Sequence, residues 1–532
     1  INIIMDKSRA VYGIDLGTTY SCIAQVDQFD QAVVLRNFEG DATTPSVVYF
    51  EDENNVLVGK DAKAMLETEP EKAVSFIKRE MGNDAAFDKS LNTTPYHLDP
   101  SEISALILKK LVKDANDANG FPEPIKDVVI TCPAYFGNKE RMQTKQAGII
   151  AGLNVLSIIN EPTAAAIAYG TKVDERKTIL VYDLGGGTFD VTIILVNKGA
   201  IKVIATGGDH HLGGVDWDTE LASYMLDAFN SANDTNFSFD GDTMLKNTLL
   251  NMAENKKKLL TGKNKVNVNI NWEGKSARFE ITRELFDSLT ISKLNETIDA
   301  TNSILEIARK KGFEKIDEFL LVGGSSRMPQ VKARIDQEYG VDARIGDVDE
   351  VVAKGAAIYA MNEAYSQAVQ EYEEGDRDDR PAPIRGDRAR VMNVTSKTYG
   401  LGLVENKVGN MIFANTSLPF SFQREFCTAY ENQHVLTLPI WESDFTNPET
   451  DSTVEDKFCR LVTSEPAKLL LNKDWPKGSP VHVTFNIDNE GMLSVHAQVE
   501  HDDIDFQLKV TGVKSEEELL TSQTLLASMN IE

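Results

Sequence analysis

Short apolar runs alternate with longer stretches of helical periodicity along the first part of the chain. Four of these runs stop at or beside Gly, Thr, Pro or Asp and predict buried strands: Val11 to Asp15, Val128 to Thr131, Thr178 to Asp183 and Phe319 to Val322. Strands that alternate with helices are typical of α/β layers. Residues 1–370 are therefore predicted to form an α/β unit.

One stretch of this unit has a similar sequence further along the chain. Tyr12 to Thr19 and Leu180 to Thr188 each carry an apolar strand that delivers Asp, then Gly, then Thr into a turn before another strand-like run. Such internal similarity indicates that the unit consists of two similar lobes.

The pattern changes after residue 370. Residues 371–392 are rich in Glu, Asp and Arg, bury little apolar area and are predicted to be a linker. Apolar residues at every second position then follow; for example, Val481 to Phe485 and Leu493 to Ala497 flank the turn residues Asp488 to Gly491. Residues 393–512 are therefore predicted to form a β-sandwich.

The remaining residues, 513–532, predict one short helix. They open with Ser515 to Glu518 ahead of two leucines, which is the pattern of a helix N-terminus. At 532 residues the chain is too long for a single hydrophobic core, which agrees with a division into several units.

Composition and charge narrow the possible partners and compartments. A formal charge of −27 would repel a phosphate backbone, so no nucleic-acid partner is expected. The longest apolar runs, such as Val191 to Val196, fall far short of the roughly 20 residues of a membrane span, and residues 1–10 lack the layout of a secretory signal. The four cysteines are scattered without a C-x-x-C pair, which argues against a zinc ribbon or a disulfide framework and favours the reducing cytoplasm: Cys22, Cys132, Cys427 and Cys459.

Two turns of small residues are candidates for phosphate binding. Gly17 to Thr19 and Gly185 to Thr188 place backbone N–H groups where they can face an anion, and two such turns facing each other would hold a polyphosphate. Asp15 and Asp183 precede the turns, and carboxylates of this kind hold hydrated Mg²⁺. Taken singly, each turn is more often just a flexible loop and each aspartate is equally a turn cap, so the prediction depends on the pairing.

Two other candidate sites are rejected. Gly274-Lys275-Ser276 resembles the end of a P-loop, but Asn269 stands where that motif requires its first glycine. His210-His211 invites a metal assignment, but no acidic or Cys partner stands at ligand spacing, which favours a simple loop.

Four motifs, in family order, resemble one known family. They are Gly13 to Ser21, Asn160 to Ala166, Asp183 to Asp190 and Val322 to Pro329, and together they resemble the seventy-kilodalton heat-shock proteins, the DnaK-like chaperones. The likeness spans Val11 to about Ala360 and continues more weakly to about residue 515.

This resemblance implies a fold and a nucleotide site. The fold would be a two-lobed actin-like ATPase domain followed by a β-sandwich peptide-binding domain, with ATP or ADP and Mg²⁺ as cofactors. The resemblance assigns Lys78 to the γ-phosphate, Glu161, Asp190 and Thr188 to the attacking water, and Asp15 and Asp183 to magnesium. The nucleotide would contact Gly17, Thr18, Thr19, Tyr20, Gly185, Gly186, Gly187, Gly213, Gly214, Glu254, Lys257, Lys258, Thr261, Gly323, Gly324, Ser325, Arg327 and Asp349.

Some of these assignments have simpler interpretations. Without the family, Lys78 is typical of a surface lysine. The spacing of Glu254, Lys257, Lys258 and Thr261 places them on one helix face, which suits a flat ring and equally suits a solvated charged face. The family commonly has arginine in place of Lys258, so a somewhat altered nucleotide affinity is expected.

In the β region, Asn415 to Pro419 and Phe426 to Gln433 resemble the family's peptide-binding segments. Aligned with the family in this way, the domain would have a cleft for an extended apolar peptide. Its lining would be Leu401, Leu403, Val404, Phe426, Ala429, Leu436 and Leu438. The same alternation is equally that of the domain's own core.

Three features depart from the family pattern. The short leucine-rich linker is replaced by the more polar Arg390 to Asn393, which is expected to dock less well as a strand. Ser157 replaces the arginine that usually precedes Ile-Ile-Asn-Glu-Pro, a position tied to linker and J-domain contact. Residues 513–532 would be the start of a truncated or absent lid. Coupling between the domains is therefore in question.

The sequence predicts an ATP-dependent molecular chaperone that hydrolyses ATP and couples hydrolysis to the binding of unfolded or extended apolar peptides. A J-domain co-chaperone and a nucleotide exchange factor are the implied partners. The alternatives are a non-hydrolysing regulatory relative and a sugar kinase on the same actin-like fold.

Overall fold

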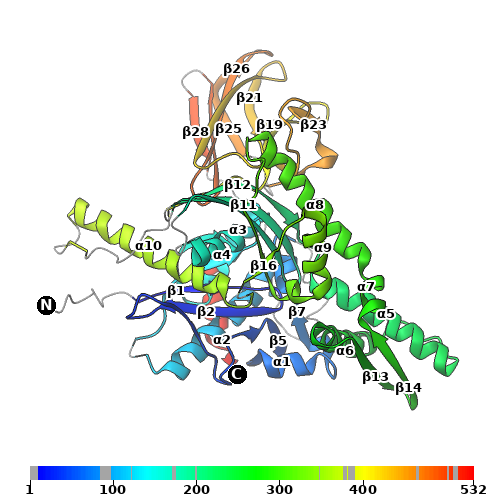
Figure 1. Cartoon of the computed structure of the whole chain (residues 1–532). Coiled ribbons are helices and arrows are strands. Elements are labelled where there is room, and N and C mark those ends of the chain that lie inside the picture. Colours follow the sequence, from blue (N-terminus) through cyan, green and yellow to red (C-terminus); the bar gives the residue numbers. More distant parts are fainter. Residues whose placement is uncertain are drawn as a thin grey trace.

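The chain folds into an α/β unit of two lobes and a separate β domain, which lies above that unit in Figure 1. This computed structural model describes residues 10–83, 98–121, 123–170, 175–197, 200–346, 348–375, 380–381, 390–462, 467–499, 502–506 and 513–532. Residues 1–9, most of the predicted charged linker and the end of the predicted β-sandwich range lie outside the described residues. None of the described helices is long and apolar enough to span a bilayer.

The first lobe is built on a sheet in the order β3-β2-β1-β8-β9, with β4 paired to β2. β1 pairs antiparallel with β2 and parallel with β8. The strands are β1 Val11–Asp15, β2 Tyr20–Val26, β3 Ala32–Leu35, β4 Thr44–Pro45, β8 Asp127–Cys132 and β9 Asn154–Asn160, and the helices are α2 Pro100–Asn119, α3 Asn138–Ile150 and α4 Glu161–Gly170.

The second lobe repeats this topology with the order β12-β11-β10-β15-β16. β10 pairs antiparallel with β11 and parallel with β15, so the two lobes share one strand arrangement and the predicted likeness is confirmed. The strands are β10 Lys177–Leu184, β11 Phe189–Asn197, β12 Ala200–Asp209, β15 Glu318–Val322 and β16 Arg344–Ile345. The helices are α5 Gly214–Asn233, α6 Thr243–Gly262, α7 Arg283–Leu289, α8 Ile291–Lys310 and α9 Pro329–Tyr339, with a hairpin of β13 Lys265–Trp272 and β14 Lys275–Thr282.

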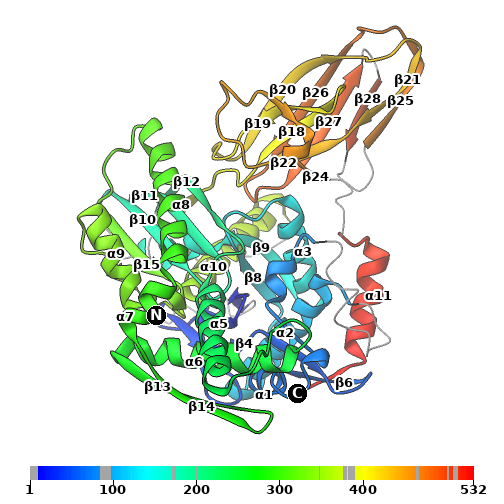
Figure 2. The same cartoon turned by 90° about the vertical axis from the view of Figure 1, so that its right-hand side faces the viewer.

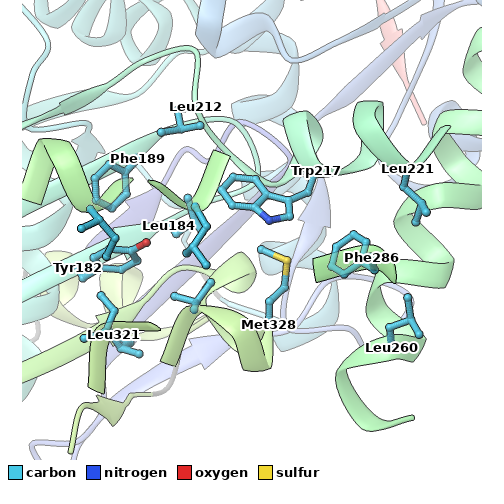
Figure 3. Close-up of a cluster of buried hydrophobic side chains, with 14 of the residues drawn as sticks. Tyr182, Leu184, Phe189, Leu212, Trp217, Leu221, Leu260, Phe286, Leu321 and Met328 are labelled. Carbon is cyan, nitrogen blue, oxygen red and sulfur yellow. The ribbon is translucent and has the colours of Figure 1, made fainter. Parts of the chain in front are cut away.

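Each lobe has its own hydrophobic core, and a third core joins the two. Trp217 is fully buried in the second lobe among Leu184, Leu212 and Met328 (Figure 3). The joining core includes α4 and α10 Val351–Glu374. α10 crosses α4 so closely that a Cβ atom on Gly355 would lie 1.7 Å from Ala164 O. Only glycine, which has no Cβ atom, fits at this crossing.

The end of the chain packs against the first lobe. α11 Glu516–Ala527 lies beside α3, as Figure 2 shows, and starts with the predicted capping box of Ser515 and Glu518. The unpredicted strand β29 Asn530–Ile531 then joins a small sheet in the order β29-β6-β5-β7. This sheet contains β5 Val47–Phe50, β6 Asn55–Val58 and β7 Ala73–Ser75, with α1 Lys60–Met65 nearby.

The β domain contains strands in three sheets and no α-helix within its described residues, in agreement with the predicted β-sandwich. The two strands predicted around Asp488 to Gly491 lie within β26 and β27. The strands are β18 Thr398–Leu403, β19 Lys407–Ile412, β20 Phe420–Cys427, β21 Gln433–Leu438, β22 Ile440–Ser443, β23 Thr453–Glu455, β24 Arg460–Leu461, β25 Ala467–Trp475, β26 Pro480–Ile487, β27 Leu493–Val499 and β28 Asp502–Phe506.

The range predicted as a linker is partly regular structure. α10 continues to Glu374, and β17 Arg390–Met392 pairs in parallel with β12 of the second lobe. Backbone hydrogen bonds do not depend on side-chain polarity, so the polar sequence of this segment does not prevent it from docking as a strand.

Candidate nucleotide-binding site

The two turns that resemble each other meet at one place. The first connects β1 to β2, and the second connects β10 to β11. A Cβ atom added to Gly186 would lie 1.9 Å from Thr19 Oγ1, and one added to Gly187 would lie 2.2 Å from Thr18 Cγ2. Side chains there would push the lobes apart, so glycine is required for this approach. The prediction that the two turns face each other is confirmed.

A cavity of about 690 Å³ opens between the lobes at these turns. Its size is that of a ligand pocket, for which roughly 300–1,000 Å³ is usual. The predicted residues that line it are Asp15, Gly17, Thr18, Thr19, Tyr20, Lys78, Glu161, Asp183, Gly185, Gly186, Thr188, Glu254, Lys257, Lys258, Thr261, Gly323, Gly324, Ser325, Arg327 and Asp349. Four predicted residues, Gly187, Asp190, Gly213 and Gly214, are not part of this lining.

Acidic side chains from both lobes converge on the cavity. Asp15 ends β1, Asp183 lies near the end of β10, and Glu161 begins α4 and forms a buried ion pair with Lys78. Burial, reinforced by Glu161, raises the pKa of Asp15 to about 7. Burial likewise raises the pKa of Asp183 well above its ordinary value. One lysine does not offset these carboxylates, so the site favours an added cation.

The donor set fits hydrated magnesium. Among the described residues, no three His, Cys, Asp or Glu side chains are grouped closely enough to ligate a metal directly. Mg²⁺ keeps several waters and is usually held by one or two carboxylates together with substrate phosphates. Asp15 and Asp183, one from each lobe, match that requirement. Thr19 Oγ1 is buried without a hydrogen-bond partner in the described part of the chain, which leaves a polar atom beside Gly186 for a ligand.

Asp190 is held close to these groups by the backbone. It lies opposite Asp183 in the β10–β11 hairpin and is 1% exposed. Its Oδ1 accepts a hydrogen bond from Ala134 N at 2.9 Å. Burial and then Glu161 raise the pKa of Asp190 well above its ordinary value, so it is a better proton acceptor than a free aspartate.

At the other end of the cavity, charged side chains bridge the two lobes. Lys63 and Lys258 each donate to Glu254 at 2.6 Å, and the hydroxyl of Tyr20 lies 3.0 Å from Lys63 Nζ. Burial raises the pKa of Glu254, but the two lysines outweigh burial and lower it to about 2. Lys63 belongs to no motif, so sequence reasoning missed it.

Lys257 has a different role from its neighbour Lys258. It is buried and donates to Gly214 O and Asp218 Oδ2, both at 2.8 Å, so it fixes the start of α5. Burial raises the pKa of Asp218 to about 6 despite that lysine. Asp218 lines the cavity and was also missed, since a single aspartate inside a helix carries no signal.

The two rejected sites lie elsewhere. Gly274 occupies the turn between β13 and β14 with a φ of 73°. His210 and His211 follow β12 on the surface with their ring centroids 4.4 Å apart, and no metal-binding group was found there among the described residues.

The residues predicted to line a peptide cleft differ in exposure. Leu401, Leu436 and Leu438 are buried in the core of the β domain. Leu403, Phe426 and Ala429 are half-buried, and Val404 is 55% exposed.

Contacts between the β domain and the α/β unit were not predicted. Arg460 of β24 donates to Glu140 of α3 at 2.5 Å and also pairs with the buried Glu442. Asn415 Oδ1 accepts from Thr206 N at 2.7 Å, and Asn415 O accepts from Lys311 Nζ at 2.6 Å. Ser157, expected to affect coupling, is buried in β9, where it is 1% exposed.

Comparison with known proteins decides the family. The family model described as Hsp70 protein matches residues 11–526. This chain belongs to the Hsp70 family. It is 36% identical over 502 residues to the chaperone protein DnaK of Thermosipho africanus, which covers 93% of this chain and 78% of the relative. It is 37% identical over 503 residues to the chaperone protein DnaK of Thermotoga neapolitana, which covers 93% of this chain and 79% of the relative.

As an Hsp70, the protein is an ATP-dependent chaperone with an actin-like ATPase domain and a β-sandwich substrate-binding domain. It hydrolyses ATP and uses ATP, ADP and Mg²⁺. The non-hydrolysing relative and the sugar kinase are not favoured.

Proposed function

We propose that this Hsp70 binds ATP with its phosphates between the two turns, Gly17 to Thr19 and Gly185 to Thr188. The close approach of Gly186 to Thr19 supports this proposal, because it forms a single cradle from both lobes. Adenosine lies toward Glu254, Lys258 and Thr261 on α6, with Gly323, Gly324, Ser325, Arg327 and Asp349 opposite. Gly213 and Gly214 support the second turn from behind.

Hydrolysis uses the buried groups beside the turns. Lys78 stabilises charge on the γ-phosphate, while Glu161, Asp190 and Thr188 orient the attacking water and accept its proton. Asp15 and Asp183 hold the hydrated magnesium, which when bound neutralises charge on the phosphate oxygens. Because Lys78 pairs with Glu161, one ion pair fixes the positions of both the lysine ammonium group and the glutamate carboxylate.

The β domain binds extended apolar segments of unfolded polypeptides. Val404, Leu403, Phe426 and Ala429 retain enough exposure to contact a peptide directly. Leu401, Leu436 and Leu438 support that surface from the core. J-domain co-chaperones and nucleotide exchange factors are the proposed partners, as the family implies.

The affinity for an unfolded apolar peptide, measured with ATP and with ADP, tests the coupled function. The docked linker strand β17 and the contacts of Arg460 and Asn415 connect the two domains, so ATP is expected to speed peptide release. Equal affinity and equal release rates in both nucleotides would contradict coupling. Val404→Asp should weaken peptide binding about tenfold, whereas Phe458→Asp, at a residue 61% exposed on the same domain, should not.

Single-turnover hydrolysis tests the catalytic assignment. Lys78→Ala should slow hydrolysis by roughly two orders of magnitude or more, because removing one charge-stabilising donor typically costs that much. Lys60→Ala, at a lysine 68% exposed, is the matched control and should hydrolyse normally. A normal rate for Lys78→Ala would overturn the assignment.

A further inference from the structure

One arginine reaches across the cleft to the second phosphate turn. Arg79 follows Lys78 in the short 3-10 helix Ile77–Glu80 of the first lobe. Its Nε donates to Gly187 O at 2.6 Å, and its Nη2 donates to Asp216 Oδ2 at 2.7 Å. Both acceptors belong to the second lobe, and the Arg79 side chain is 16% exposed. Neither contact is implied by any motif considered above.

Three successive backbone carbonyls of the second turn accept hydrogen bonds, and Arg79 binds the third of them. Gly185 O accepts from Gly214 N at 3.0 Å, and Gly186 O accepts from Val215 N at 2.8 Å, so the start of α5 holds two carbonyls of the turn. Gly187 O is the third, and it is held by Arg79 instead. Two of the three supports therefore come from the second lobe itself, while the third exists only when the first lobe is in place.

The third support sets the direction of a neighbouring N–H group. The carbonyl of Gly187 and the N–H of Thr188 belong to one planar peptide group and point in opposite directions. Fixing that carbonyl toward Arg79 therefore aims the Thr188 N–H away from it. Asp216 strengthens the arrangement, since the same Oδ2 also accepts from Gly213 N at 2.7 Å.

We propose that Arg79 is a positioning residue that makes the orientation of the second phosphate turn depend on closure of the lobes. It acts through Gly187 and Asp216, not on the nucleotide itself. One short helix thereby carries two successive residues with different roles. Lys78 is the proposed γ-phosphate lysine, and Arg79 aligns the opposite turn. This inference rests on the proposed nucleotide site.

Hydrolysis and nucleotide binding, measured separately, test the proposal. Arg79→Ala should reduce the single-turnover rate roughly ten- to a hundredfold, somewhat less than loss of a direct donor. Its dissociation constant for ADP should change less than threefold, because the two supports from α5 remain. Arg79→Lys should recover part of the rate, since one ammonium replaces one of the two hydrogen bonds but not the planar pair. Arg36→Ala, which removes an exposed arginine that donates to Gly40 O, should leave both values unchanged.

The outcomes separate this inference from the proposed site. If Lys78→Ala abolishes hydrolysis while Arg79→Ala keeps the normal rate, the site stands and the role of Arg79 is wrong. If Arg79→Ala weakens ADP binding while hydrolysis of saturating ATP keeps its normal rate, Arg79 contributes uniform binding and the positioning role is also wrong. If Lys78→Ala hydrolyses normally, the proposed site itself fails.

Discussion

The nucleotide cleft and the surface that joins the β domain to the ATPase domain each hold more carboxylates than cations, but the carboxylates are paired differently. In the cleft, Lys78 pairs with Glu161, while Asp15 and Asp183 form no ion pair within the described part of the chain. At the domain surface, Arg460 forms an ion pair with both Glu140 and Glu442.

The difference indicates what each region is built to contact. A cluster with unpaired carboxylates and an unpartnered hydroxyl is prepared for a cation and a ligand from solution. A cluster that pairs within the chain is prepared for another part of the same protein. The presence of a cation partner within the chain thus distinguishes a docking surface from a ligand site. Four changes test the contacts of these two regions, of the chain end and of Lys311.

The largest effect is expected in the cleft. Gly186→Val places side-chain atoms where Thr19 already stands and should lower the affinity for ATP roughly a thousandfold, or ~4 kcal/mol. Titration calorimetry measures it. Gly262→Val is the matched control, since a Cβ there has no neighbour within 4 Å. Similar affinities for the two variants would show that the turns do not hold the nucleotide.

A smaller loss is expected where the end of the chain meets the first lobe. Leu526 is fully buried in that lobe's core, so Leu526→Ala should destabilise the docked α11 by about 3 kcal/mol. Hydrogen exchange of the α11 amides should become more than a hundredfold faster. Leu520→Ala, at a leucine 64% exposed on the same helix, should change little, and equal exchange in both variants would contradict the packing argument.

The paired charges at the domain surface should matter less. Arg460→Met leaves Glu140 and Glu442 without their cation and should weaken docking by about 2 kcal/mol. This is below the roughly 3–5 kcal/mol of fully buried pairs because Arg460 is 46% exposed. Exchange of the β17 amides should accelerate roughly thirtyfold. Lys457→Met, at an exposed lysine close by in sequence, is the control. Unchanged protection in Arg460→Met would show that the pairs of Arg460 with Glu140 and Glu442 do not hold the domains together.

The smallest expected effect is the contribution of Lys311 to the pH dependence of stability. Burial, and then Lys202, lowers the pKa of Lys311 to about 8, whereas a free lysine titrates near roughly 10.4. Between these values the unfolded protein binds the proton more tightly, so stability of the folded protein should rise with pH from about 8 to 10.4, and only slightly because Lys311 is exposed and screened by solvent. Lys311→Met should lack this increment when unfolding temperatures are compared from pH 7 to 10. Parallel curves for the two proteins would contradict the assignment.

Much of the fold could be predicted from local pattern. The four strands at Val11, Val128, Thr178 and Phe319 and the capping box at Ser515 were found because period and turn residues act over short distances. The likeness of the two turns predicted both the repeated lobe and the facing pair. The burial of Leu401, Leu436 and Leu438 was not decided by sequence, since alternation does not say which side of a sheet is covered.

The sequence by itself determined the two lobes, the paired turns, the β domain and the family, because each is written in contiguous residues with a local physical signature. Only the tertiary structure decided that Lys63 reaches Glu254, that Arg79 crosses to Gly187, that Arg390–Met392 forms a strand and that Leu526 enters the first core. These contacts join residues far apart in the chain, and their side chains or backbone groups have many possible partners until the cores have packed. Packing selects one partner from that set, and no local pattern records the choice.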